Sequence, residues 1–123
     1  MSRAAANRPE PWLGIDLGTS DMCAGLWTNG RVEILRNEEG YTNTPTYVLY
    51  KSENDVVVGM AAKSAARYAE NTIYDIKRLI GRSFNDRDLI NDRQTWPFQV
   101  INGEHDRPQV ILNSIEDGGG VSH

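Results

Sequence analysis

The dipeptide Asn29-Gly30 constrains the fold of this chain more than any other feature of its sequence. Both residues tolerate a positive φ, so Asn-Gly between two apolar runs is a strong signal of a β-hairpin. The segment after it, 31–35, alternates apolar and polar residues as a strand does. An earlier apolar run, 12–17, ends at a second group of turn residues. We therefore predict a three-stranded antiparallel meander over residues 12–35.

The remainder of the chain predicts strands interleaved with short helices. Isoleucines at 73, 76 and 80 have helical spacing, and Gly81 and Pro97 are residues that end helices. Expected strands cover 46–50, 56–59, 98–102 and 109–113, and expected helices cover 59–70, 72–80 and 86–96. The sequence therefore predicts a mixed α/β chain with a single modest core, since 123 residues are few for more than one.

Composition excludes several classes of protein. The formal net charge is −4, from 13 basic and 17 acidic side chains without a dense Lys/Arg block, which argues against a nucleic-acid binder. No apolar run is long enough to span a membrane. The single cysteine, Cys23, excludes an internal disulfide and a multi-cysteine zinc site, and we expect it to be buried. A reduced compartment is consistent with this cysteine usage, so we expect a cytoplasmic protein.

The segment 14–20, Gly-Ile-Asp-Leu-Gly-Thr-Ser, has the residues of a phosphate-binding turn. Gly18 has no Cβ, so its backbone can approach a ligand closely, and Thr19 and Ser20 supply N–H groups and hydroxyls. Asp16 beside such a turn could hold Mg²⁺ through water. The same residues are also those of an ordinary β-hairpin turn, and composition alone favours that interpretation.

Five sequence blocks resemble the 70-kDa heat-shock chaperones, in the family's order and spacing. The resemblance covers roughly 12–113, and the segment 14–20 is similar to the family's first phosphate loop. The other four blocks are 32–48 (VEI, Asn37, Gly40 and TPTYV), 59–63 (GMAAK), 71–82 (NTIYDIKRLIGR) and 96–100 (WPFQV).

The resemblance implies the fold of an actin-like, ribonuclease-H-like ATPase, whose nucleotide lies between two lobes. This chain is similar only to the first part of that nucleotide-binding domain: 12–45 match the base of one lobe, and 46–113 match its outer subdomain. We therefore expect a truncated lobe, a β meander plus an outer α+β subdomain. We also expect a disordered N-terminus at 1–11 and a flexible Gly-rich tail at 114–123.

The resemblance also implies roles for individual residues. Asp16 would lie near the water shell of Mg²⁺, and Gly18, Thr19 and Ser20 would contact the β- and γ-phosphates of ATP. Lys77 would be the catalytic lysine, which orients and polarises the attacking water; a compact ammonium suits that task. Without the resemblance, Lys77 and the following arginine are simply a solvated pair on a helix.

The sequence departs from the family at several positions. Asp21 stands where the family has an aromatic residue beside the nucleotide, and an acid there repels phosphates. Thr42 stands where the family usually has Arg, whereas Ser20 in place of Thr keeps the hydroxyl. The glycines at 118–120 do not form a second phosphate loop, because no apolar strand precedes them and no Thr follows them.

The resemblance therefore implies an N-terminal fragment of a chaperone that binds and hydrolyses ATP when intact. It implies ATP/ADP and Mg²⁺ as ligands, and unfolded peptides, J-domain proteins and nucleotide-exchange factors as partners. Alone, we expect this chain to be inactive, since phosphoryl transfer needs groups that converge from several sides. The alternatives are a non-catalytic short form that binds chaperones or co-chaperones, and an unstable product without function.

Overall fold

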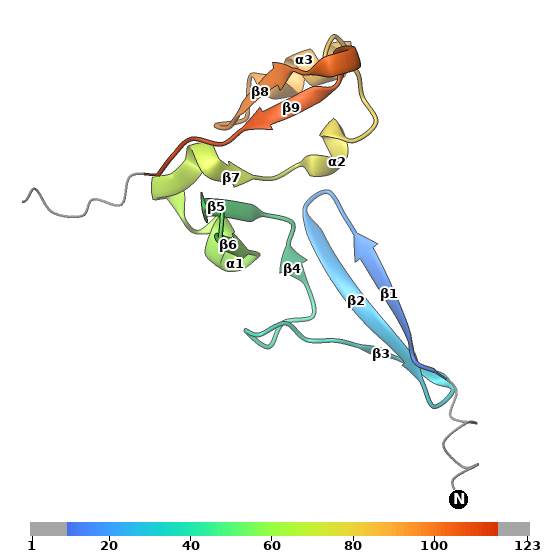
Figure 1. Ribbon diagram of the computed structural model, residues 1–123. Helices are drawn as coiled ribbons and strands as arrows, with labels where there is room; N and C mark the ends of the chain where they lie inside the picture. Colours follow the sequence, from blue (N-terminus) through green and yellow to red (C-terminus); the bar gives the residue numbers. More distant parts are fainter. Residues whose placement is uncertain (1–9, 116–123) are drawn as a thin grey trace, which may run out of the picture.

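A computed structural model describes residues 10–115 and has a mixed α/β architecture with three small sheets (Figure 1). The expected disordered N-terminus, 1–11, and flexible tail, 114–123, fall almost wholly outside the described residues. Within that part of the chain, no helix is long and apolar enough to cross a membrane.

The first sheet is the predicted antiparallel meander. Its strands are β1 (Trp12–Leu17), β2 (Asp21–Thr28) and β3 (Arg31–Ile34), with β4 (Thr44–Pro45) paired to the start of β2. Thr28 pairs with Arg31 across Asn29 and Gly30, whose φ angles are 52° and 77°. These positive angles are those of the hairpin turn that the dipeptide predicts, so the prediction is confirmed.

Both faces of the meander are apolar and open to solvent. The pairing register places Trp12, Trp27 and Val32 side by side on one face and Leu13 and Ile15 on the other. These five side chains are between 47% and 75% exposed. Trp12 and Trp27 are thus not packed into the core. Strands that are apolar on both faces are typical of a sheet covered by a layer on each side.

The second sheet carries the short helices that follow it. Its strands are β5 (Val48–Ser52), β6 (Asp55–Val58) and β7 (Thr72–Ile73), in the order β6-β5-β7, followed along the chain from β6 by α1 (Met60–Lys63) and the 3-10 helix η2 (Ala66–Asn71). The expected continuous helix over 59–70 was wrong. Ala65, with φ −86° and ψ 60°, leaves the helical region between α1 and η2, and Ala62 is the one fully buried alanine of this segment.

The expected helix over 72–80 is helical only in α2 (Ile76–Leu79). Thr72 and Ile73 instead form β7, paired with Leu49 and Val48 of β5. Both are β-branched, which favours a strand over a helix. The Asn71 side-chain amide donates to the Tyr50 carbonyl at 3.1 Å and fixes the start of this pairing.

The last part of the described chain agrees with the sequence. Helix α3 (Arg87–Arg93) is followed by the antiparallel hairpin of β8 (Gln99–Asn102) and β9 (Pro108–Ile111), with the 3-10 turn η3 (Glu104–Asp106) between the strands. The Asp86 carboxylate accepts hydrogen bonds from the Asp88 and Leu89 N–H groups and caps α3. These elements confirm the predicted helix and the two predicted strands.

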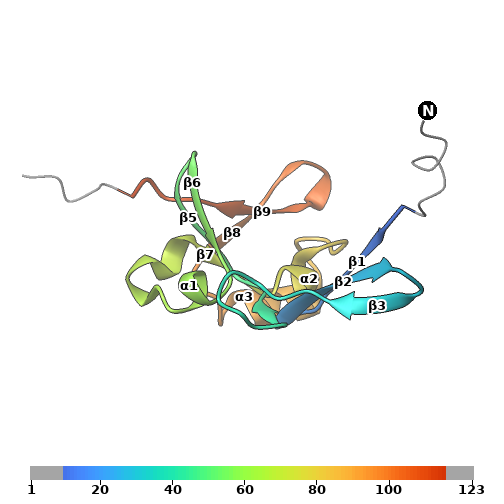
Figure 2. The same ribbon diagram turned by 90° about the horizontal axis from the view of Figure 1, so that it is seen from below.

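The main core holds β7, α2, α3 and β8 together. Its buried members are Ile73, Leu79, Leu89, Trp96 and Phe98. Figures 1 and 2 show that the meander extends away from this core, while the turn between β1 and β2 points back toward β4 and α2. The core therefore supports one side of the region where the candidate site lies.

Candidate functional site

The turn between β1 and β2 is built on the absence of a side chain at Gly18. The Gly18 N–H donates to the Asp21 carbonyl at 3.0 Å, leaving Thr19 and Ser20 as the two central residues. A Cβ on Gly18 would lie 2.3 Å from the Asp21 carbonyl oxygen, which is far inside van der Waals contact. Gly18 is therefore required for close approach of two backbone segments, and its φ is not positive.

Thr46 anchors this turn from outside the hairpin. Its hydroxyl donates to the Gly18 carbonyl at 3.0 Å, and its N–H donates to the Ser20 carbonyl at 2.9 Å. Neither Thr19 nor Ser20 has a positive φ, so the turn lacks the primed geometry that matches the twist of a hairpin. The two bonds from the buried Thr46 hold a turn that the hairpin alone does not favour.

The donors that remain on the turn suit an anion. Among the described residues, no hydrogen bond uses the N–H groups or hydroxyls of Thr19 and Ser20. Adjacent N–H groups and hydroxyls on a tight turn are the groups that bind phosphate oxygens. The exposed Asp21 at the end of the turn opposes this, because its carboxylate repels an anion.

Asp16 is exposed on β1, opposite Cys23 of β2. Within residues 10–115, no group of three or more His, Cys, Asp or Glu side chains is close enough to hold a metal ion. One carboxylate suits Mg²⁺ that keeps most of its waters, rather than an ion enclosed by protein ligands. Cys23 is half-buried, so the expectation that it is buried was wrong.

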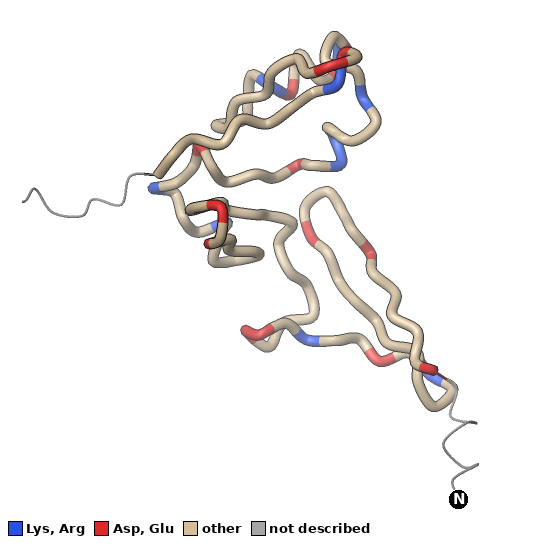
Figure 3. The backbone as a smooth tube through the Cα atoms, viewed as in Figure 1, with Lys and Arg blue, Asp and Glu red and all other residues tan. Residues whose placement is uncertain are grey.

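Lys77 lies on α2 and is exposed. Figures 1 and 2 both place α2 beside the turn between β1 and β2. In Figure 3 acidic positions lie along β1 and β2, and basic positions lie on α2. The fold thus brings the element that carries Lys77 to the same region as the turn of Gly18, Thr19 and Ser20.

A stack of two tyrosines joins the two parts of the site. The Tyr47 and Tyr74 rings are stacked, with centroids 4.8 Å apart and planes inclined by 14°. Tyr47 follows Thr46, which anchors the turn, and Tyr74 shortly precedes α2. Burial raises the pKa of the Tyr74 phenol, and Tyr47 and Asp75 raise it further. Sequence reasoning missed this pair, although both residues lie in blocks that carry the family resemblance.

Comparisons with known proteins agree with this part of the sequence. The family model described as "Hsp70 protein" matches residues 12–118. The "Heat shock cognate HSP70 protein" of Trypanosoma brucei brucei is 52% identical over 107 residues, covering 86% of this chain and 16% of that protein. The "Heat shock cognate 70 kDa protein 3" of Dictyostelium discoideum is 44% identical over 100 residues, covering 80% and 16%.

The chain covers a larger share of a third relative. The "Heat shock 70 kDa protein cognate 1" of Drosophila simulans is 42% identical over 115 residues, which cover 88% of this chain and 53% of that protein. The chain thus spans about a sixth of the length of the first two relatives and about half of the third. With a family model that matches most of its residues, the chain belongs to the Hsp70 protein family.

Proposed function

We propose that this chain is the N-terminal part of the ATPase domain of a 70-kDa heat-shock chaperone, with the actin-like fold of that family. Family membership over residues 12–118 and the small share of the relatives that the chain covers support this proposal. Residues 12–45 then form the base of one lobe, and residues 46–113 form its outer subdomain. The two apolar faces of the meander are consistent with a sheet at the base of a layered lobe.

The observation that carries the proposal is the turn that Thr46 holds. Gly18, Thr19 and Ser20 form a tight turn in which the N–H groups and hydroxyls of Thr19 and Ser20 have no partner among the described residues, and these donors bind the β- and γ-phosphates of ATP. Because Thr46 fixes the turn before the nucleotide arrives, little ordering is required on binding.

Lys77, on α2 beside this turn, acts on the transferred phosphate. Its ammonium orients and polarises the attacking water and offsets the negative charge that builds on the γ-phosphate. Asp16 holds Mg²⁺ through water molecules. When bound, this ion would supply positive charge that offsets the charge developing on the phosphates.

In the intact chaperone, ATP hydrolysis drives the binding and release of unfolded peptides, together with J-domain proteins and nucleotide-exchange factors in the cytoplasm. The 123-residue chain alone has no measurable turnover, because Asp16 and Lys77 are exposed and bulk water screens their charges. Phosphoryl transfer depends on positioned charges that water does not screen.

The test is a chimera in which this chain replaces the matching segment of the Trypanosoma brucei relative. Affinity for Mg²⁺-ADP is measured by calorimetry, and ATP turnover is measured by phosphate release. Gly18→Ala should weaken nucleotide binding about tenfold or more. This corresponds to the loss of at least one charge-assisted hydrogen bond. Gly14→Ala is the matched control, because a Cβ there meets only the Gly25 carbonyl oxygen, at 3.9 Å.

The same chimera tests the role of Lys77. Lys77→Ala should reduce kcat about 100-fold or more, as expected for a preorganised charge, while ADP affinity changes little. The proposal fails if Gly18→Ala and Gly14→Ala bind ADP equally well, or if Lys77→Ala hydrolyses ATP at the parent rate.

A further inference from the structure

Asp75 immediately precedes α2 in an unusual conformation. It has φ 56° and ψ 29°, which is the left-handed region that non-glycine residues rarely adopt. It occupies the N-cap position of α2, yet its carboxylate caps no N–H group of that helix. Asp86 at the start of α3 does cap its helix, through two N–H groups. The Asp75 carboxylate therefore serves a different purpose.

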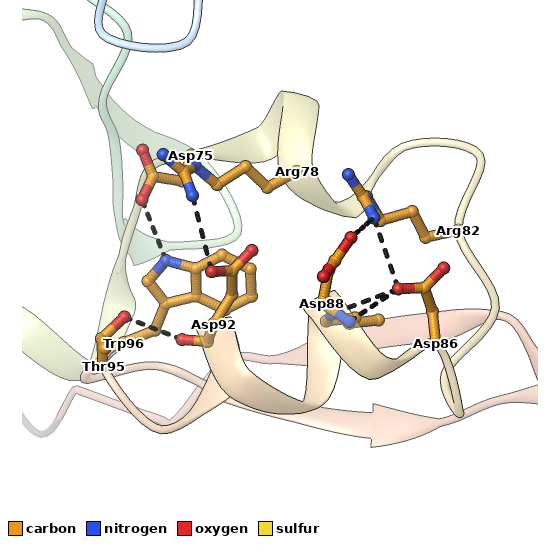
Figure 4. Close-up of polar contacts among 9 residues, drawn as sticks. Asp75, Arg78, Arg82, Asp86, Asp88, Asp92, Thr95 and Trp96 are labelled. Carbon is orange, nitrogen blue, oxygen red and sulfur yellow. Dashed lines mark hydrogen bonds and ion pairs between the residues drawn. The ribbon is translucent and has the colours of Figure 1, made fainter.

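That purpose is a hydrogen bond to the indole of Trp96. The Trp96 Nε1–H donates to Asp75 Oδ2 at 3.1 Å, as Figure 4 shows. Trp96 is only 7% exposed, and its ring stacks on Phe98 with centroids 5.2 Å apart. Because the indole is fixed in the core, the bond ties the backbone of Asp75, and hence the start of α2, to a rigid point.

A second link between α2 and the end of α3 is weaker. Arg78 and Asp92 form an ion pair at 3.5 Å, and the Arg78 side chain is 52% exposed (Figure 4). Exposed pairs of this kind contribute little. Lys77 lies in sequence between Asp75 and the buried Leu79, so core packing holds the end of its short, four-residue helix and the bond between Asp75 and Trp96 fixes its start.

We propose that Trp96 and Asp75 are positioning residues for Lys77. The indole N–H holds Asp75 in its left-handed conformation, which sets the direction in which α2 leaves β7 and thus where the Lys77 ammonium is presented to the nucleotide. The inference rests on the proposed role of Lys77 in ATP hydrolysis. Displacing a catalytic group by about 1 Å can cost on the order of 100-fold in rate, so such support matters for kcat.

Three variants in the chimera separate the hydrogen bond from other effects. Trp96→Phe removes the donor and keeps an aromatic ring against Phe98. Asp75→Gly removes the acceptor but tolerates a positive φ. Asp75→Asn keeps an acceptor oxygen and also tolerates that conformation, so it should retain the ATP turnover of the parent. Asp92→Asn is the control, because it breaks only the exposed ion pair with Arg78.

Trp96→Phe and Asp75→Gly should lower kcat about tenfold or more, with KM for ATP changed less than about twofold. Asp75→Asn and Asp92→Asn should remain within about twofold of the parent. If Trp96→Phe and Asp75→Gly keep the parent kcat while Lys77→Ala loses it, the positioning role is refuted and the proposed function stands. If Lys77→Ala itself leaves kcat unchanged, both the positioning role and the proposed function are refuted.

A readout independent of activity uses nuclear magnetic resonance on the same proteins. The Cα chemical shift of residue 75 and the three-bond coupling between its amide proton and its Hα report its φ. In Trp96→Phe these values should move away from the left-handed region, while in Asp92→Asn they should not change. Unchanged values in Trp96→Phe would overturn the proposal whatever the kinetics show, because the indole would then not hold the backbone of Asp75.

Discussion

The hydroxyl of Thr46 donates a hydrogen bond to the carbonyl oxygen of Gly18 at 3.0 Å, across 28 positions of the chain. The bond ties the turn between β1 and β2 to the segment between β4 and β5, which leads into the second sheet. Tyr47, the next residue, stacks on Tyr74 before α2. The turn and the helix that carries Lys77 are therefore held by neighbouring residues of one segment.

Replacement of Thr46 by Val should loosen this turn. Val keeps the shape of the side chain and removes the donor, so the free energy of unfolding of the chimera should fall by about 1 kcal/mol, as measured by urea unfolding. Affinity for Mg²⁺-ADP should fall as well, because the turn is less ordered. Thr46→Ser keeps the hydroxyl and should retain both properties. Equal ADP affinity in the Val and Ser variants would contradict this role.

The phenol of Tyr74 should make stability depend on pH in the alkaline range. Burial, Tyr47 and Asp75 raise its pKa above the ordinary value of 10.0. Above about pH 10 the unfolded chain loses this proton while the folded chain retains it, so the free energy of unfolding falls as pH rises toward the raised pKa. Below pH 10 the phenol contributes no slope.

The test compares urea unfolding of the wild-type chain, Tyr74→Phe and Tyr41→Phe between pH 8 and the alkaline range. Tyr74→Phe should reduce the alkaline slope, and Tyr41→Phe, at a tyrosine that is 66% exposed, is the control for removing a phenol. A slope that is the same in all three proteins would show that Tyr74 titrates alike in the folded and unfolded states.

Much of the fold was predictable because its signals are local. The Asn29-Gly30 turn specifies a hairpin by its own backbone preference, and the Asp86 cap lies directly before α3. The expected helix over 72–80 was wrong at its start because the structure there depends on a distant partner. Thr72 and Ile73 become a strand because β5 offers an edge to pair with, and helical spacing in the sequence does not report that edge.

The candidate site was predictable to a different extent. The composition of the turn indicated Gly18, but the structure gives a more specific reason for it, which is the approach of the Asp21 carbonyl oxygen. The supports at Thr46, Tyr74 and Trp96 could not be found from spacing. Each acts through a contact with a residue far away in the sequence, and only the folded chain brings those partners together.

The turn between β8 and β9 can be stabilised by a substitution at His105. His105 has φ 56° and is followed by Asp106 with φ 58°, although neither is glycine or asparagine. Asn accepts this conformation more readily than His, so His105→Asn should stabilise the chain by about 0.5 kcal/mol in urea unfolding. Because the His105 side chain is exposed, replacing it should remove little packing. His105→Val, which is β-branched, should destabilise the chain by about 1 kcal/mol. The reverse order of the two variants would contradict this explanation.

The open faces of the meander should make the 123-residue chain associate with itself. Ile15 is 67% exposed on one face, and Val32 is 59% exposed on the other. Contiguous exposed apolar side chains on a sheet with open edges favour association. Sedimentation velocity should therefore show a mean mass that rises with concentration. The double variant Ile15→Lys, Val32→Lys should remain monomeric to higher concentration, with its unfolding free energy within about 0.5 kcal/mol of the parent.

Tyr41→Lys is the matched control for this double variant, because Tyr41 is as exposed as Ile15 but lies outside the strands of the meander. It should associate as the parent does. If the parent chain stays monomeric at all concentrations and unfolds in one sharp transition, the exposed faces do not drive association. If Tyr41→Lys reduces association as much as the double variant does, added positive charge is the cause rather than the loss of apolar surface.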